Sequence, residues 1–206
     1  MFKKFFSAVL ITMFVIGTSA VSQAATFNDV PAGHWANGAI EKLVADGVIK
    51  ADGKNFNGNN NATRYDMTMM LAGLFNKVST EKATGEVPFS DIPANHPAYD
   101  AVRTMAALGV MEGYGDGTFL GDREITREEL AMTINTFLEK GGLTFENASS
   151  SFSDVPSGHW AYRHVSRMYS EKFMEGYGDG TFKGKNKITK LELALIIAKI
   201  DDKYFS

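Results

Sequence analysis

The chain contains no cysteine among its 206 residues, so disulfide bonds cannot hold its fold together. It also lacks an excess of either charge, because 21 basic residues stand against 24 acidic ones and give a formal charge of −3 at pH 7. Such a chain has no general attraction for nucleic acid or anionic membranes, so any anion that it binds needs a local site. With 44% hydrophobic residues, it must gain stability by burying apolar side chains in a shared core.

Long hydrophobic runs are also missing, apart from one at the amino terminus. Lys3 and Lys4 precede an apolar run over residues 5–16, and a stretch of small residues follows and ends at Ala24. This order is typical of a secretory signal peptide, so we predict that residues 1–24 are removed and that the protein is secreted. The run is too short to cross a bilayer comfortably, and we expect no transmembrane segment in the mature chain. Without the two lysines the formal charge becomes −5.

The remaining sequence repeats itself three times. A motif that reads FNDVPAGHWA at Phe27 returns as FSDIPANHPA at Phe89 and as FSDVPSGHWA at Phe152, at intervals of 62 and 63 residues. A second motif, Ile-Thr-Arg in its fullest form, recurs every 63 residues further along each copy. A period of this length is typical of proteins built from stacked units. We therefore predict three repeats, at residues 27–76, 89–139 and 152–201, which are joined by polar linkers.

Each repeat predicts two helices separated by loops. The first begins near the His-Trp-Ala stretch and carries apolar residues at i, i+3 and i+4, which share one helical face; in the third copy they are Val165, Met168 and Tyr169. The second begins with a capping box, a threonine followed three residues later by an acid. An apolar stripe follows each box: Met67, Met70, Leu71 and Leu74; Leu130, Ile134, Phe137 and Leu138; Leu193, Ile196, Ile197 and Ile200. These stripes predict an all-α protein whose repeats pack against one another.

The stretch MEGYGDGTF occurs twice, at residues 111–119 and 174–182. Its spacing matches neither a P-loop nor a dinucleotide-binding fingerprint. Each copy holds a single aspartate, whereas a calcium loop needs several carboxylates at alternate positions. We therefore expect no cofactor and no metal. The glycines favour a tight turn with positive φ, and Phe119 and Phe182 are predicted to fix this turn in the core.

A basic residue follows the capping threonine in every repeat, as Arg64, Arg127 and Lys190. A cation at the first position of a helix faces the positive end of the helix dipole, which is unfavourable by about 0.3–1 kcal/mol. Two explanations are open at this point. Each cation pairs with a nearby acid of its own or of a neighbouring repeat, or the cation, free helix amides and the glycine loop together bind an anion.

Aromatic side chains occupy matching places in the loops. Trp35 and Trp160 open the first helices of two repeats, and Tyr114 and Tyr177 lie in the glycine loops. An aromatic face beside polar groups is suited to stacking a sugar ring. For the tryptophans alone, a half-buried side chain that closes a repeat is the simpler interpretation.

No catalytic motif is evident in the sequence. The metalloprotease pattern H-E-x-x-H is absent. Potential acid or base residues recur once per repeat: His34, His96 and His159; Asp29, Asp91 and Asp154. Since a single active site would be unique to one copy, we expect these residues to shape the loops and the protein not to be an enzyme. A carboxylate pair for glycoside hydrolysis stays open as an alternative.

Taken together, the motifs FSDVPSGHWAY, GYGDGTF and ITREEL resemble the hallmarks of the S-layer homology (SLH) family over residues 27–200. The resemblance implies a pseudo-threefold spindle with a central three-helix bundle and grooves between the modules. It also implies a cell-envelope protein that anchors non-covalently to the cell wall. The ligand implied is a pyruvylated secondary cell-wall polysaccharide or a modified peptidoglycan.

The resemblance also implies the residues that contact the ligand. In the family, the basic residue of the Ile-Thr-Arg motif meets the acidic pyruvyl group, while the tryptophan and the glycine loop line the groove. By match, these are Arg64, Arg127 and Lys190 as cations, Trp35 and Trp160 as aromatic walls, and Gly115 and Gly178 as loop positions.

The three copies depart from the family pattern in different ways. Pro97 replaces the tryptophan of the second repeat, an asparagine-rich run over residues 57–61 replaces the regular loop of the first, and Lys190 replaces arginine in the third. Because a lysine lacks the planar fork of arginine, we expect the three grooves to be unequal. The alternative function is that of a structural subunit in a surface layer or envelope assembly, with an S-layer protein as partner and without direct glycan binding.

Overall fold

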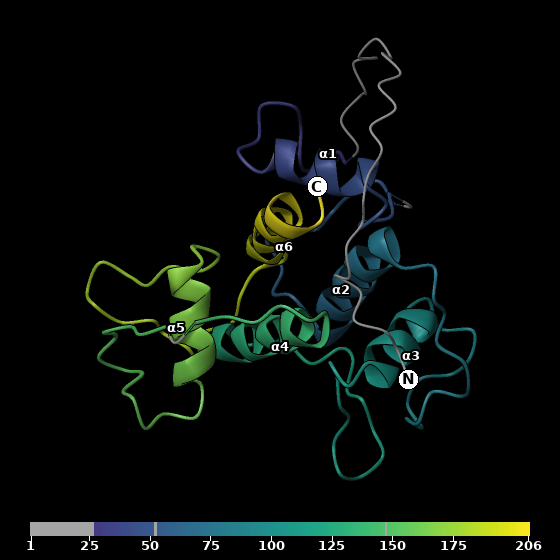
Figure 1. The fold of residues 1–206 in the computed structure, drawn as a ribbon. Helices are drawn as coiled ribbons and strands as arrows, with labels where there is room; N and C mark the ends of the chain where they lie inside the picture. Colours follow the sequence, from purple (N-terminus) through teal and green to yellow (C-terminus); the bar gives the residue numbers. More distant parts are fainter. Residues whose placement is uncertain (1–26, 52, 147) are drawn as a thin grey trace.

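The computed structural model describes residues 27–51, 53–146 and 148–206, so the predicted signal peptide lies outside the described residues. The described part contains six α-helices and no strand, which confirms the all-α prediction (Figure 1). Each repeat contributes a short helix followed by a longer one. The helices are α1 (Asn37–Ala45), α2 (Arg64–Val78), α3 (Tyr99–Ala107), α4 (Arg127–Lys140), α5 (Tyr162–Ser170) and α6 (Lys190–Tyr204).

The long helices begin where their capping boxes predict. Thr63, Thr126 and Thr189 each accept a hydrogen bond from the backbone amide three residues later, and the acid at that position accepts one from the threonine amide. The box is complete even in α2, where the shorter Asp66 stands in place of glutamate. Local side-chain chemistry therefore sets the start of all three long helices.

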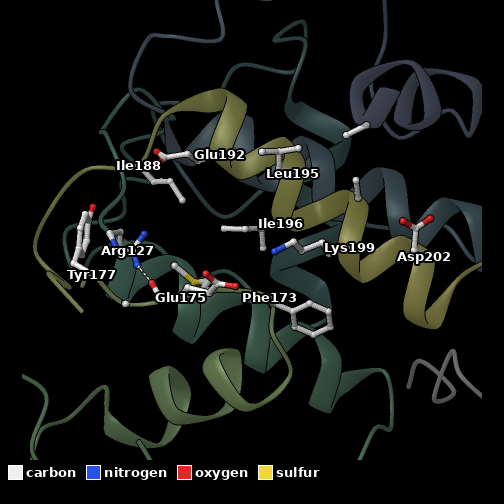
Figure 2. Close-up of a pocket in the computed structure, with 14 residues that line it drawn as sticks. Arg127, Phe173, Glu175, Tyr177, Ile188, Glu192, Leu195, Ile196, Lys199 and Asp202 are labelled. Atoms are coloured by element: carbon white, nitrogen blue, oxygen red, sulfur yellow. Dashed lines mark hydrogen bonds between the residues drawn. The ribbon is translucent and has the colours of Figure 1, made fainter. Parts of the chain in front are cut away.

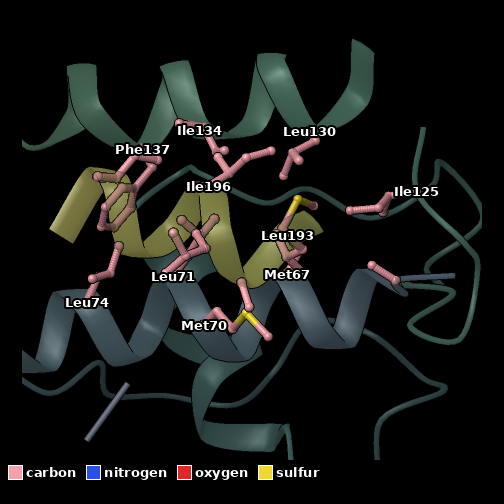
Figure 3. Close-up of a cluster of buried hydrophobic side chains, with 14 of the residues drawn as sticks. Met67, Met70, Leu71, Leu74, Ile125, Leu130, Ile134, Phe137, Leu193 and Ile196 are labelled. Carbon is pink, nitrogen blue, oxygen red and sulfur yellow. The ribbon is translucent and has the colours of Figure 1, made fainter. Parts of the chain in front are cut away.

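The apolar stripes of α2, α4 and α6 face one another across the core (Figure 3). Every stripe residue predicted from the sequence is buried. Thr133, which interrupts the stripe of α4, is also buried and donates its hydroxyl hydrogen bond to the Glu129 carbonyl oxygen one turn earlier. The first helices follow their prediction less closely, because Tyr169 is 46% exposed and lies with its ring against the edge of Phe152 instead of in the core.

Each short helix packs against the long helix of the preceding repeat. Helix α3 packs against α2, α5 packs against α4, and α1 packs against α6, as Figure 1 shows. The last of these contacts joins the first repeat to the third and closes the three repeats into a ring. A repeat therefore completes its core with a neighbour, which is the physical reason why one copy would not be stable alone.

Backbone hydrogen bonds close the same ring at its centre. The amide of Ala62 donates to the carbonyl of Ile188 at 2.8 Å, that of Ile125 donates to Ala62 at 3.0 Å, and that of Ile188 donates to Ile125 at 3.4 Å. Each repeat thus gives one bond to a neighbour and receives one from the other. These residues directly precede the capping threonines, so the ring brings the starts of α2, α4 and α6 together.

The first amides of each long helix bond to the next repeat in the ring. The Arg64 amide donates to the Arg123 carbonyl at 3.0 Å, and the Tyr65 amide donates to the Gly121 carbonyl at 2.9 Å. The equivalent pairs in α4 and α6 repeat this pattern. Gly121 has to be glycine, because a Cβ atom there would lie 2.0 Å from the Tyr65 ring. The loop backbone of one repeat thus caps the helix of its neighbour.

A group of charged side chains ties α1, α2 and α6 together near the carboxyl terminus. Lys77 donates to Asp201 at 2.7 Å and to Asp46 at 3.0 Å, while Lys42 lies 2.8 Å from Asp46 and also contacts Asp201. The Asp201 side chain is fully buried, so its charge needs these two lysines. The group adds an electrostatic link to the contact that closes the ring.

Two glycines in helices test this packing, because the same substitution should act in opposite directions. In an exposed helix position, glycine to alanine stabilises by roughly 0.5–1 kcal/mol. We expect this gain for Gly38→Ala, which has open space beside it. A Cβ at Gly73 would lie 2.6 Å from the carbonyl oxygen of Val48, so Gly73→Ala should instead destabilise by about 1–3 kcal/mol. Urea unfolding of both variants measures the difference in stability. Equal effects would contradict the packing of α2 against the loop that contains Val48.

The charged group predicts a loss of stability in acid. The hydrogen bond from Lys42 holds the pKa of Asp46 well below its ordinary value of 3.8. A carboxylate whose pKa is depressed in the folded state stabilises the fold above its unfolded pKa, and this contribution is lost as the pH falls. The free energy of unfolding should therefore decrease below about pH 4. Urea titrations at several pH values, with Asp46→Asn as the control, measure this; an equally steep decline in the variant would assign the effect to other groups.

Candidate functional site

A cavity of about 460 Å³ opens where the second and third repeats meet (Figure 2). Arg127 at the start of α4 lies at one end, and Tyr177 of the third repeat's glycine loop lies beside it. Helix α6 forms a long wall with Glu192, Ile196 and Lys199. The cavity therefore combines an apolar surface with charged groups of both signs.

Neutral groups of the neighbouring loop hold Arg127 in place. Its Nε atom donates to the carbonyl of Phe182 at 3.0 Å, and its Nη2 atom donates to the carbonyl of Glu175 at 2.6 Å. The guanidinium carbon lies 4.5 Å from the centre of the Phe182 ring and 5.3 Å from that of Tyr177. No carboxylate of the described residues lies within ion-pair distance. The side chain is 8% exposed, and this burial lowers the pKa of Arg127, although the nearby Tyr177 and Glu192 act in the opposite direction.

Arg64 occupies the matching place between the first and second repeats. Its Nε donates to the carbonyl of Phe119 at 2.9 Å and its Nη2 to that of Glu112 at 2.7 Å, while its guanidinium lies 5.3 Å from the centre of the Tyr114 ring. A second guanidinium, Arg123, also lies over Tyr114, at 5.6 Å. Arg123 is paired with Glu129 and has no basic counterpart in the other repeats.

Lys190 differs from the two arginines. Its Nζ lies 3.1 Å from Oδ1 of Asp66, the acid of the first repeat's capping box, and 4.9 Å from the centre of the Phe56 ring. Of the two explanations for the basic residues, pairing with a neighbouring repeat's acid thus applies to Lys190 only. The idea that free helix amides assist an anion is wrong, since carbonyls of the next repeat already occupy the first two amides of each helix.

The glycine loops are tight turns, as predicted. In the second repeat, Gly117 has a φ of 83°, and the Asp116 carboxylate accepts hydrogen bonds from the Thr118 amide at 3.0 Å and its hydroxyl at 2.7 Å. The third repeat has the same bonds. Phe119 and Phe182 are fully buried, which confirms that they fix the loops in the core. The aspartate thus serves the turn itself.

The repeated aspartates clamp the end of each loop. Asp154 accepts hydrogen bonds from the amides of Phe182 and Lys183, both at 2.8 Å. Lys183 has a φ of 52°, a conformation that non-glycine residues rarely adopt, and the two bonds hold it there. Asp91 and Asp29 make the same pair of bonds in the other repeats. These carboxylates are committed to architecture.

The histidines and tryptophans of the first motif play separate parts. The Nδ1 atom of His159 accepts a hydrogen bond from the Ala161 amide at 3.2 Å, and His34 and His96 do the same, which closes the turn before each short helix. Trp35 is 66% exposed and Trp160 is 53% exposed, so neither is the half-buried plug that the sequence favoured. Neither tryptophan is among the residues that line the cavity beside Arg127.

The sequence motifs identified some of the residues around this cavity and missed others. Gly115 and Gly178 are exposed with open space around them, yet neither lines the cavity. Lys199 lines the cavity, and Lys183 lies 4.2 Å from the centre of the Tyr177 ring, but neither was expected from the motifs. A search for repeated positions overlooks both lysines, because each occurs in one repeat only.

Two absences among the described residues bear on the site. No group of three or more His, Asp or Glu side chains gathers there in a way that suits a metal ion. None of the described helices is both long enough and apolar enough to cross a membrane.

The structure is a module built from three helical repeats that close into a ring, with a groove where the second and third repeats meet. Most of the polar residues that recur in every repeat hold the loops in place. The sequence profile of the S-layer homology domain matches residues 26–68, 88–131 and 151–194. The chain therefore belongs to the S-layer homology domain family, with three domains in tandem.

Several curated relatives of the chain are named as surface proteins. The chain is 32% identical to cell surface glycoprotein 1 of Acetivibrio thermocellus over 69% of its own length and 6% of the relative's. It is 30% identical to a cellulosome-anchoring protein of the same organism over 69% of its length and 32% of the relative's. S-layer protein sap of Bacillus anthracis is 27% identical over 98% of the chain and 25% of the relative. The chain thus spans a third or less of these relatives.

The aspartate clamp makes a prediction for the loop that carries Tyr177. Removing the side chain in Asp154→Ala leaves two amides without their charged acceptor, and hydrogen bonds to charged groups contribute about 1.5–3 kcal/mol each. We expect a loss of about 2 kcal/mol in stability and faster hydrogen exchange at Phe182 and Lys183. Glu86→Ala, at an exposed linker position, is the control. Unchanged exchange at both amides would show that the clamp is dispensable.

Proposed function

We propose that this protein is a non-covalent anchoring module that binds an anionic polymer of the cell wall in the grooves between its repeats. The observation that carries the proposal is Arg127, a guanidinium held by carbonyls and aromatic rings at the wall of an open cavity. Because no described acid pairs with it, its charge stays available to a ligand. The names of the relatives, among them a cellulosome-anchoring protein and an S-layer protein, support a place at the cell surface.

The chemistry of the groove suits a pyruvylated sugar or a similarly acidic wall glycan. A guanidinium binds a carboxylate through two parallel hydrogen bonds, and its orientation here is already set by Phe182 and Glu175. The exposed Tyr177 ring offers a face on which a sugar ring stacks. The polar loop around Gly178 leaves room for hydroxyl groups at the edge of the groove.

The other residues predicted to bind the ligand support the proposal to different degrees. Arg64 forms a second contact of the same kind, and Trp35 and Trp160 present exposed aromatic surface next to the turns. Gly115 matches Gly178 in the second repeat. We further propose that the three repeats form the pseudo-threefold spindle of the family, that the chain is secreted, and that it has no catalytic activity.

Binding to purified cell wall tests the function. The triple variant Arg64→Ala, Arg127→Ala, Lys190→Ala should lose at least about tenfold in affinity, because a hydrogen bond to a charged group contributes about 1.5–3 kcal/mol. The control triple variant Lys82→Ala, Lys140→Ala, Arg163→Ala changes the net charge equally at exposed positions. Cosedimentation with the wall measures affinity, and circular dichroism checks the fold. Equal binding by the triple variant and the parent protein would overturn the anion-binding account.

The alternative function is a structural subunit of a surface layer. It rests on the relatives that are named as surface-layer proteins. Static light scattering of the pure protein separates the two functions, because ordered self-association without wall material would favour assembly over anchoring.

A further inference from the structure

A second cavity, of about 510 Å³, lies where the chain leaves α4 and where α5 and α6 end. Its wall contains Phe145 of the linker after α4, Arg167 and Glu171 at the end of α5, and Tyr204 at the end of α6. It shares no lining residue with the cavity beside Arg127. The two cavities are therefore separate sites, and a substitution in one leaves the lining of the other unchanged.

The residues of this second cavity do not recur in the other repeats. Arg167 corresponds to Thr104 in the second repeat and to Lys42 in the first, at the same intervals of 63 and 62 residues. Phe145 lies in a linker, outside the repeated motifs. A residue that recurs in every copy serves the architecture of each repeat, whereas these residues serve one place only.

Contacts from two segments hold the Arg167 side chain, which is only 5% exposed. Its Nη1 atom donates to Oδ1 of Asn135 at 2.7 Å and to Oε1 of Glu139 at 3.0 Å, both on α4. Its guanidinium carbon lies 3.9 Å from the centre of the Phe145 ring. The cation is therefore fixed in orientation without a ligand, which reduces the entropy lost on binding.

One edge of the Arg167 guanidinium has no partner among the described residues. Its Nε atom is buried without a hydrogen bond, and its Nη2 atom donates to no described acceptor. Arg64 and Arg127 use the same two atoms to bind a pair of carbonyl oxygens. These N–H groups are parallel on the planar fork, so the edge matches the two oxygens of a carboxylate. Because a buried donor without a partner is costly, the edge is suited to an acceptor that a ligand supplies.

Glu171 offers an acceptor on the same wall, one helical turn after Arg167. Its Oε2 atom accepts hydrogen bonds from Lys203 at 2.6 Å and from the Tyr204 hydroxyl at 2.8 Å, while no described donor bonds to Oε1. Burial opposes ionisation, but the bonds from Lys203 and Tyr204 hold the pKa of Glu171 below its ordinary value of 4.5. Glu171 is therefore an anion with one oxygen left for an N–H group of a ligand.

The charges around the cavity indicate which class of ligand fits. Three cations share two carboxylates there: Arg163, Arg167 and Lys203 with Glu139 and Glu171. The exposed Glu146 is a further acid of the wall and balances the remaining positive charge. A polymer with many negative charges would therefore meet repulsion from the acids of the wall. A ligand that carries one carboxylate beside an N–H donor matches both the edge of Arg167 and the oxygen of Glu171.

We propose that this cavity binds a peptide carboxyl terminus. The terminal carboxylate lies on the Nε and Nη2 edge of Arg167, and an N–H of the same ligand donates to Oε1 of Glu171. The Phe145 and Tyr204 rings contact the apolar part of the peptide. A free amino acid supplies the same carboxylate and N–H donor, so the two sources share this chemistry. The site does not depend on the anchoring function, because it lies apart from the groove beside Arg127.

Isothermal titration calorimetry of the mature chain with small probes tests the ligand chemistry. N-acetyl-alanyl-alanine carries both groups and should bind, and its carboxyl-terminal amide should bind at least about tenfold more weakly, because the contact with a charged guanidinium is lost. Propionate keeps the carboxylate without the N–H donor and should also bind more weakly. Binding of free alanine as tight as that of the peptide would assign the site to amino acids. Equal binding of the amide, or no binding of either peptide or alanine, would overturn the proposal.

Substitutions locate the ligand in the cavity. Arg167→Lys keeps the charge but removes the paired N–H edge, so the peptide should bind at least about tenfold more weakly. Arg103→Lys is the matched control, because the Nε atom of Arg103 is also buried without a partner but Arg103 does not line this cavity. The control should bind as the parent does, and circular dichroism checks both folds.

A blocking variant keeps the test decisive even if Arg167→Lys does not fold. Thr144 is an exposed residue of the cavity wall, so Thr144→Trp fills the opening and leaves Arg167 and its partners in place. Peptide binding should be lost in this variant. Binding equal to that of the parent would show that the peptide binds elsewhere and would overturn the assignment.

Discussion

The ring of backbone hydrogen bonds among Ala62, Ile125 and Ile188 is the constraint on which the rest of this structure depends. It brings the first turns of three long helices together, so the loop of each repeat lies against the helix start of another. Core and site then arise from the same contacts. The short helices complete their cores on a neighbouring repeat, and the cavity beside Arg127 is lined by residues of more than one repeat. Since the ring closes by joining the first repeat to the third, no repeat retains either its core or its groove alone.

This arrangement explains why a cation is tolerated where the field of a helix repels it. The unfavourable dipole interaction at Arg127 amounts to about 0.3–1 kcal/mol. Two hydrogen bonds from the guanidinium to carbonyls of the third repeat contribute about 1.5–3 kcal/mol each, so they outweigh it. Stacking on Phe182 and Tyr177 adds to this balance. Lys190 differs, because its ammonium is a point charge without the planar fork of a guanidinium, and it pairs with Asp66.

Much of the fold could be predicted from the sequence, because its determinants are local. The capping boxes at Thr63, Thr126 and Thr189 act over three residues, and the apolar stripes act over single helical turns. The expectation of half-buried tryptophans was wrong, because the neighbouring histidine closes the turn by itself and leaves Trp35 exposed. The alternative in which free helix amides help to bind an anion was also wrong, since carbonyls of a different repeat occupy those amides.

By itself, the sequence determined that there are three copies of a two-helix unit, where each long helix begins, and which phenylalanine holds each glycine loop. Those features depend on side chains within a few residues of one another. Only the tertiary structure decided which charges remain available. The carbonyls that hold Arg127 lie 48 and 55 residues away from it in the chain, and the acid that neutralises Lys190 belongs to the first repeat. A repeated motif gives three cations the same local context, but partners from other repeats make their electrostatic surroundings differ.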